Sequence, residues 1–113
     1  MRLLKNLIGK ESDLCLADII LTEILQGFKS DTDFLIAKKH LLSFPIYSLA
    51  GLDSYIAASQ IYRLCRKKGL TIRKTFDCLI AQIAIENDLV LLHNDKDYDM
   101  IAKAAPLRIA MVE

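Results

Sequence analysis

The sequence predicts an α/β protein with a mainly parallel central sheet. Short apolar runs alternate along the chain with longer segments of helical periodicity, and this alternation is typical of repeated strand–helix units. Residues 89–92 are apolar at every position, as expected of a parallel strand that is covered on both faces. The length of 113 residues suits one domain with one core. We therefore expect a single domain over residues 1–113.

The first half of the chain predicts two strands between helices. Residues 1–9 carry apolar side chains at helical spacing ahead of Gly9, so a short helix is expected there. Residues 13–17 suit a buried strand, and Asp18 suits the N-cap of a helix over residues 19–28. Asp31 or Thr32 then caps a helix that reaches Leu42. Pro45 ends that segment and opens a strand over residues 45–49.

The second half of the chain continues the same pattern. An amphipathic helix is expected over residues 53–68, with Gly69 ending it. Residues 76–87, preceded by Thr75, form a helix that is apolar on most sides and therefore belongs in the centre of the molecule. The remaining predicted elements are a strand at 89–92, a helix at 97–105 and a strand at 107–112. In the helix that reaches Leu42 and the helix at 53–68, the residues expected on the inner faces are Phe34, Leu35, Leu41, Leu42, Ile56, Ala57, Ile61, Leu64 and Cys65.

Composition excludes several classes of protein. Hydrophobic residues make up 53% of the chain and charged residues 26%, which is typical of a folded domain and not of a disordered one. No apolar run approaches the ~20 residues that span a bilayer, so no membrane contact and a cytoplasmic location are expected. The three widely spaced cysteines suit reduced, packed thiols better than disulfides or a zinc site. The net charge of +1 does not exclude RNA, because a local basic stripe suffices to bind it.

Four acidic residues stand where an α/β sheet keeps its chemistry, outside the carboxyl ends of its strands. Glu23 lies on a largely apolar helix, where burying a charge is costly without a compensating group. Asp77 begins the most apolar helix, and Asp95 and Asp97 follow the strand at residues 89–92. Each acid also has an ordinary structural interpretation. Asp77 suits a helix's first turn, Asp95 or Asp97 suits a helix cap, and Glu23 suits a solvated helix position.

Clustered carboxylates are typical ligands of hard divalent cations, which prefer oxygen atoms. A magnesium ion is often held by one or two carboxylates while it keeps waters and phosphate oxygens of a substrate. Such an ion activates water for attack on a phosphodiester and compensates the charge of the leaving oxygen. If the acids converge, they predict metal-dependent hydrolysis of RNA.

Three segments, in order, resemble the conserved blocks of VapC-type PIN-domain toxins. Residues 69–81 resemble the central motif around Asp77, and residues 91–102 resemble the strand that ends in Asp-x-Asp followed by an aromatic residue. Residues 18–27 look like the helix that brings a Glu into the site, here Glu23. The resemblance covers nearly the whole chain. It implies a three-layer PIN-like fold, cleavage of RNA, Mg²⁺ or Mn²⁺ as cofactor, and a cognate antitoxin.

The resemblance suggests roles for the acids. Glu23, Asp77 and Asp95 are expected to hold the metal, with Asp97 assisting the catalytic site through coordination or a bound water. Arg73 and Lys74 stand just ahead of Asp77, where they could meet RNA phosphates or carboxylates of a partner, although solvated surface charge is an equal expectation.

The start of the chain departs from the family pattern. The family opens with an apolar strand that ends in a metal-ligand Asp, whereas residues 1–9 predict a helix. We therefore expect a PIN domain that lacks its first strand and first acid, because of a truncated or misplaced start or as a natural remnant. Losing an anionic ligand weakens magnesium binding. Losing a central strand exposes backbone groups of its neighbours, which predicts a homodimer or a swapped strand.

Two other functions compete with the enzyme. A catalytically inactive PIN fold could still bind an antitoxin or its own copy through apolar helix faces, and the absent first acid favours this alternative. A receiver-like phosphoryl-transfer domain would need an acidic pair after its first strand, and the sequence has none there. The sequence therefore predicts a magnesium-dependent endoribonuclease toxin, with the inactive binding module as the alternative.

Overall fold

Five strands form one parallel sheet in the computed structural model, which describes residues 2–4, 14–93 and 95–111. The strands are β1 (Arg2–Leu4), β2 (Leu14–Ala17), β3 (Ile46–Tyr47), β4 (Val90–His93) and β5 (Arg108–Met111). Their order across the sheet is β3-β2-β1-β4-β5, and every neighbouring pair is parallel. The prediction of an α/β fold with a mainly parallel sheet is confirmed.

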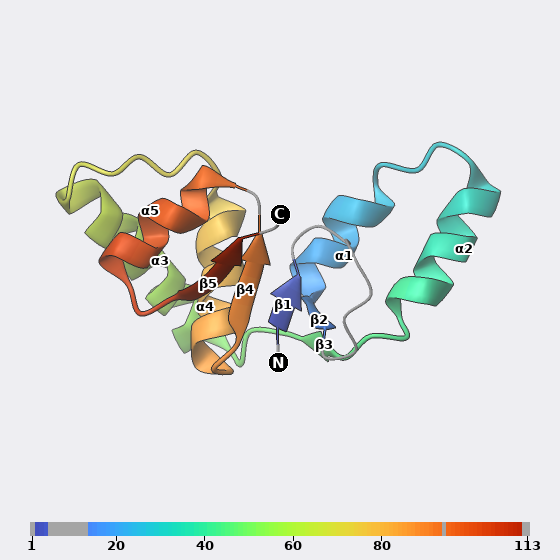
Figure 1. The fold of residues 1–113 in the computed structure, drawn as a ribbon, viewed down its shortest axis with the longest axis horizontal. Helices are drawn as coiled ribbons and strands as arrows, with labels where there is room; N and C mark the ends of the chain where they lie inside the picture. The colour runs from blue at the N-terminus through green and yellow to red at the C-terminus, as the bar shows by residue number, and fades with distance from the viewer. Residues whose placement is uncertain (1, 5–13, 94, 112–113) are drawn as a thin grey trace.

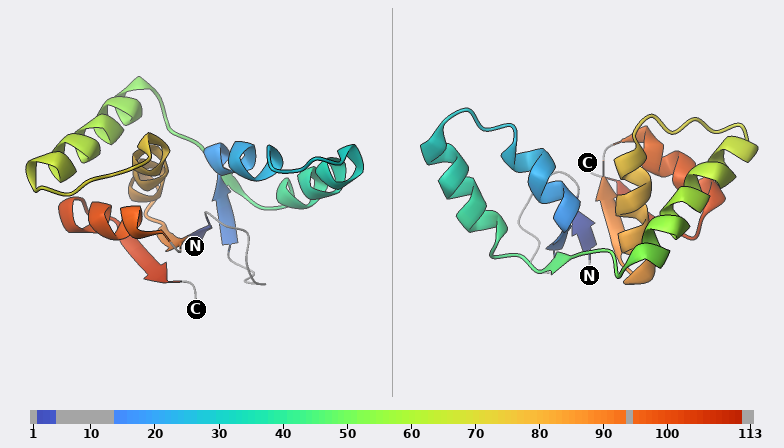
Figure 2. Two further views of the ribbon diagram at one scale, coloured as in Figure 1. Left: turned by 90° about the horizontal axis from the view of Figure 1, so that it is seen from above. Right: turned by 180° about the vertical axis from the view of Figure 1, so that it is seen from behind.

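Within the described part of the chain, five helices connect these strands. They are α1 (Asp18–Leu25), α2 (Asp31–Leu41), α3 (Leu52–Lys67), α4 (Thr75–Glu86) and α5 (Lys96–Ala104). Helices α1 and α2 lie on the side of β2 and β3, whereas α3, α4 and α5 lie on the side of β4 and β5 (Figure 1). Figure 2 shows the same two groups of helices from above and from behind. The molecule is elongated, measuring 45 × 25 × 24 Å along its principal axes.

The centre of the sheet corrects two expectations. The predicted opening helix is wrong over Arg2–Leu4, because these residues form β1; the rest of that predicted helix lies outside the described residues. The expectation that the first strand is missing is also wrong, since Leu3 pairs with Cys15 of β2 on one side and Leu91 of β4 on the other. Unpaired backbone groups inside a sheet are costly, so pairing on both sides outweighs a helical spacing of leucines. Because β1 fills this position, β2 and β4 expose no strand edge there that would favour a homodimer.

The buried core takes residues from β2, β4, α3, α4 and α5. All four residues of β2 are buried, and α4 buries residues over most of its length. The cysteines Cys15, Cys65 and Cys78 are all buried, which confirms their packing role. Burial raises the pKa of the Cys78 thiol to about 12, and the nearby Cys65, Asp77 and Asp97 add to this rise. Cys78 is therefore a neutral thiol at physiological pH.

The inner faces of the amphipathic helices are only partly as predicted. Leu41, Ile61 and Cys65 are buried, whereas Leu35, Leu42 and Ile56 are more than half exposed. Periodicity identifies these helices but overestimates how much of α2 is covered, because α2 packs mainly against α1 at one end of the molecule (Figure 1). Among the described residues, no helix combines the length and apolarity required to cross a bilayer.

Candidate active site

Asp77 is carried into the interior by the first turn of α4. This helix begins at Thr75 after the segment that follows Gly69, whose positive φ of 74° allows the chain to turn at the end of α3. The Asp77 side chain is fully buried, and its Oδ1 accepts a hydrogen bond from the Tyr98 hydroxyl at 2.9 Å. Burial and then the charge of Asp77 raise the pKa of Tyr98, so the phenol keeps its proton and remains a donor.

Asp95 and Asp97 lie just beyond the carboxyl end of β4, as the sequence predicts. Asp95 is the N-cap of α5, and its Oδ1 accepts a hydrogen bond from the Asp97 backbone N–H at 3.0 Å. The ordinary interpretation of Asp95 as a helix cap is therefore correct as well. A cap leaves the second carboxylate oxygen, Oδ2, directed to other groups, so capping and a role in the site are compatible.

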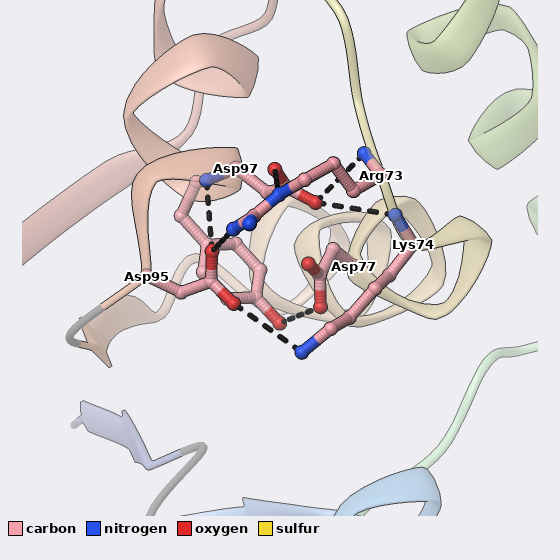
Figure 3. A network of polar contacts seen from close by, with 6 residues as sticks. Arg73, Lys74, Asp77, Asp95 and Asp97 are labelled. Atoms are coloured by element: carbon pink, nitrogen blue, oxygen red, sulfur yellow. Dashed lines mark hydrogen bonds and ion pairs between the residues drawn. The ribbon is translucent and has the colours of Figure 1, made fainter.

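Asp97 connects the start of α5 to the residues that precede α4. Its side chain is 2% exposed, and its Oδ2 accepts hydrogen bonds from the backbone N–H groups of Arg73 at 3.0 Å and Lys74 at 3.2 Å. Figure 3 shows both bonds converging on this oxygen. Asp97 therefore fixes the position of the segment from which α4 presents Asp77.

Two cations lie over the same carboxylates. Arg73 places Nη2 at 3.3 Å from Asp95 Oδ1 and Nε at 3.4 Å from Asp97 Oδ1. The Nζ of Lys74 lies 3.6 Å from Asp95 Oδ2. The hydrogen bond and charge of Asp97, together with Asp95, raise the pKa of Arg73. Both cations are more than half exposed, so they pair with the acids while they stay accessible to a ligand (Figure 3).

Three predicted site residues converge. Asp77, Asp95 and Asp97 each offer a carboxylate oxygen, and these oxygens lie within 4.8 Å of one another. The all-oxygen donor set, gathered in one place, fits a hard divalent cation. Ionised, the three acids outnumber Arg73 and Lys74 by one charge, which also favours a cation.

Glu23 is not one of these three residues. It lies half-buried on α1 and lines a neighbouring cavity of about 430 Å³. The other residues of this cavity are Ile19, Thr22, Gln26, Lys74 and Phe76. Lys74 is shared between the cavity and the acidic cluster, because its ammonium group also pairs with Asp95.

Sequence reasoning missed several residues of this region. The Tyr98 hydroxyl bound to Asp77 had no signal beyond an aromatic residue following Asp97. Thr22, Gln26 and Phe76 were also missed as a group, because a cavity between two helices depends on how they pack. Phe76 is exposed although the next two residues of α4 are buried, and the sequence pattern does not indicate this exposure.

Together these observations define a parallel α/β domain with an acidic cluster at the carboxyl edge of its sheet. The model of the PIN domain family matches residues 1–104 of this chain. The chain belongs to the PIN domain family. It is 31% identical over 107 residues to Ribonuclease VapC11 of Mycobacterium tuberculosis, covering 94% of this chain and 80% of the relative. VapC ribonuclease Mb1587 of Mycobacterium bovis matches with the same identity and coverage.

Solved structures with the same fold include toxin–antitoxin complexes. VapBC-5 from Mycobacterium tuberculosis superposes with a TM-score of 0.76 at 15% identity, covering 98% of this chain and 98% of that one. VapBC2 from Rickettsia felis, solved with a DNA fragment from its promoter, gives a TM-score of 0.71 at 20% identity, covering 88% and 75%. At these identities the likeness concerns the fold. It confirms the PIN-like fold that the sequence predicts.

Proposed function

We propose that this chain is a single-domain, divalent-metal-dependent endoribonuclease that acts as the toxin of a toxin–antitoxin pair. The observation that carries the proposal is the convergence of Asp77, Asp95 and Asp97 within 4.8 Å. The 31% identity to proteins named VapC ribonucleases supports RNA as the substrate. The VapBC complexes among the structural relatives support a cognate antitoxin as the partner.

The metal ion we propose is Mg²⁺ or Mn²⁺, held by Asp77 and Asp95 with the help of Asp97 and of Glu23, which lines the adjoining cavity. When bound, such an ion supplies a water activated for attack on the phosphodiester and compensates the charge of the leaving oxygen. The protein's own part is to orient the carboxylates. Tyr98 holds Asp77 through its hydroxyl, while the Asp97 N–H holds Asp95.

Arg73 and Lys74 are proposed to meet the RNA backbone. A phosphate that approaches three carboxylates is repelled unless cations are nearby. Both side chains are exposed and end beside Asp95, so either can exchange a carboxylate partner for a phosphate oxygen. An acidic side chain of an antitoxin could replace the same carboxylate partner of Arg73 or Lys74.

A second candidate function has one observation in its favour. Lys5 and Asn6 follow β1, at the position where the family pattern leads us to expect a metal-ligand Asp. With one anionic ligand fewer, metal affinity falls. The alternative is therefore an inactive PIN domain that binds an antitoxin or a second copy of itself.

The experiment compares RNA cleavage by the wild-type chain and by Asp77→Asn, in Mg²⁺, Mn²⁺ or EDTA. We expect cleavage that requires the metal and falls at least about 100-fold in Asp77→Asn, since a bound metal contributes several kcal/mol to transition-state stabilisation and each ~1.4 kcal/mol is a factor of ten. Asp53→Asn removes an exposed carboxylate in the first turn of α3 and serves as the matched control.

Three outcomes separate the candidates. Metal-dependent cleavage that Asp77→Asn abolishes and Asp53→Asn preserves supports the ribonuclease. Cleavage that persists in EDTA or in Asp77→Asn contradicts the proposed site. A chain that cleaves no RNA but binds the antitoxin encoded beside it supports the inactive binding module.

A further inference from the structure

A cavity between α1 and the start of α4 adjoins the acidic cluster. Its volume is about 430 Å³, within the range of ~300–1,000 Å³ typical of sites for small molecules. Ile19, Thr22, Glu23 and Gln26 line it from α1, and Lys74 and Phe76 line it from the start of α4. The cavity and the cluster share Lys74, whose Nζ lies 3.6 Å from Asp95 Oδ2 (Figure 3). A ligand group in this cavity therefore lies next to the carboxylates.

Phe76 differs from its neighbours on α4. The residues that follow it, Asp77 and Cys78, are buried, whereas the Phe76 ring is 56% exposed and lines the cavity. An aromatic ring in this position offers a face on which a planar group can stack. A nucleobase is the planar group that a polynucleotide would bring beside a phosphate-binding cation.

The cavity's remaining walls suit the same ligand. Ile19 supplies an apolar surface, while the Thr22 hydroxyl and the Gln26 amide supply donors and acceptors for the edge of a base. Lys74 supplies the positive charge for the adjoining phosphate. The wall combines an apolar surface, polar side chains and a cation, so an RNA nucleotide matches it better than an aliphatic side chain does.

We infer that this cavity is a subsite for one nucleobase of the RNA, stacked on Phe76, next to the phosphodiester at the acidic cluster. The inference rests on the proposed ribonuclease function and adds a subsite to it. Stacking on an aromatic side chain tolerates every base, because each has a π-face. The subsite therefore selects unpaired RNA, in which a base is free to leave its neighbours, over duplex RNA.

The test measures binding separately from cleavage. Fluorescence anisotropy, in EDTA, gives the Kd of the full chain for a short single-stranded RNA and for versions in which one nucleotide at a time is abasic. We expect one abasic position to weaken binding by the wild type about tenfold, the typical size of one stacked base. In Phe76→Ala the intact RNA should already bind about tenfold more weakly, and that abasic position should have no further effect.

Controls keep the outcome interpretable. Phe76→Trp retains an aromatic face and should restore the dependence on that base, while Phe28→Ala removes an exposed aromatic side chain outside the cavity and should change nothing. Circular dichroism confirms that each variant is folded.

Several results would overturn the inference. It fails if wild type and Phe76→Ala lose affinity equally at every abasic position, if Phe76→Ala behaves like Phe28→Ala, or if the chain binds no RNA. The failure of the proposed function is a different result. Base-dependent binding through Phe76 without metal-dependent cleavage contradicts the ribonuclease and keeps the subsite, whereas cleavage without that dependence contradicts the subsite alone.

Discussion

The Tyr98 hydroxyl of α5 donates a hydrogen bond to Asp77, and the Tyr98 ring is completely buried. A hydrogen bond of 2.9 Å to Oδ1 restricts the rotation of the Asp77 carboxylate. Groups that orient a metal ligand without touching the metal commonly change metal affinity when they are removed. Tyr98 is thus a positioning residue for the acidic cluster.

We predict that Tyr98→Phe weakens Mn²⁺ binding about tenfold, the lower end of the usual effect of such partners. The ring is retained, so the core stays filled, while Asp77 loses the donor that orients it. Isothermal calorimetry measures the Kd for Mn²⁺. Tyr62→Phe, on the partly buried Tyr62 that contacts Arg66, is the matched control. Equal Mn²⁺ affinities in all three proteins would show that the hydroxyl does not orient Asp77.

At this scale the sequence predicts the convergence of three of the four candidate acids but not how they are held. Asp77, Asp95 and Asp97 are predictable because strand ends and helix starts are visible in the pattern, and these points of a parallel sheet share one edge. The placement of Glu23 beside a cavity, outside the group of three aspartates, depends on how α1 lies relative to the start of α4. Side-chain direction at a helix surface is set by tertiary contacts, which periodicity does not describe.

Among the elements, α4 and α5 form the unit that builds the site. Asp97, in the first turn of α5, accepts hydrogen bonds from two consecutive backbone N–H groups just before α4. These bonds fix the position of the loop after α3, which has no regular secondary structure of its own. The helices could be predicted to within a few residues because Pro45, Gly69 and Pro106 interrupt the pattern. The contact between α4 and α5 could not, since it joins residues more than twenty positions apart.

We predict that Asp97→Ala lowers the free energy of unfolding by about 3 kcal/mol. The substitution removes a buried carboxylate and leaves the N–H groups of Arg73 and Lys74 without their acceptor, and hydrogen bonds to charged groups are each worth about 1.5–3 kcal/mol. Urea denaturation followed by circular dichroism measures the change. Asp53→Ala, at an exposed first-turn acid of α3, should cost less than about 0.5 kcal/mol. A similar loss in both variants would argue against the proposed link between α4 and α5.

For the whole molecule, β1 joins two groups of elements. Its three residues, Arg2–Leu4, pair with β2 on one side and with β4 on the other. This arrangement could not be predicted from residues 1–9, where the spacing of leucines also suits a helix. Pairing with strands that are distant in sequence decided between the two structures, and a local pattern contains no information about such partners.

We predict that Leu3→Pro lowers the free energy of unfolding by about 3 kcal/mol or more. Proline removes a backbone donor in the middle of the sheet and is tolerated there only at edges and bulges. Leu3→Val retains the donor and should have a small effect. The urea midpoint of each variant provides the measurement. If Leu3→Pro unfolds at the same urea concentration as Leu3→Val, the central position of β1 does not support the fold.

The narrow backbone bridge formed by β1 has a mechanical consequence. Asp77, Asp95 and Asp97 lie to one side of it with β4, whereas Glu23 and the wall of the cavity formed by α1 lie to the other with β2 (Figure 1). Bending of the sheet at β1 would change the distance between Glu23 and the three aspartates. A ligand that contacts both α1 and the start of α4 would hold the two groups of elements together and reduce motion about β1.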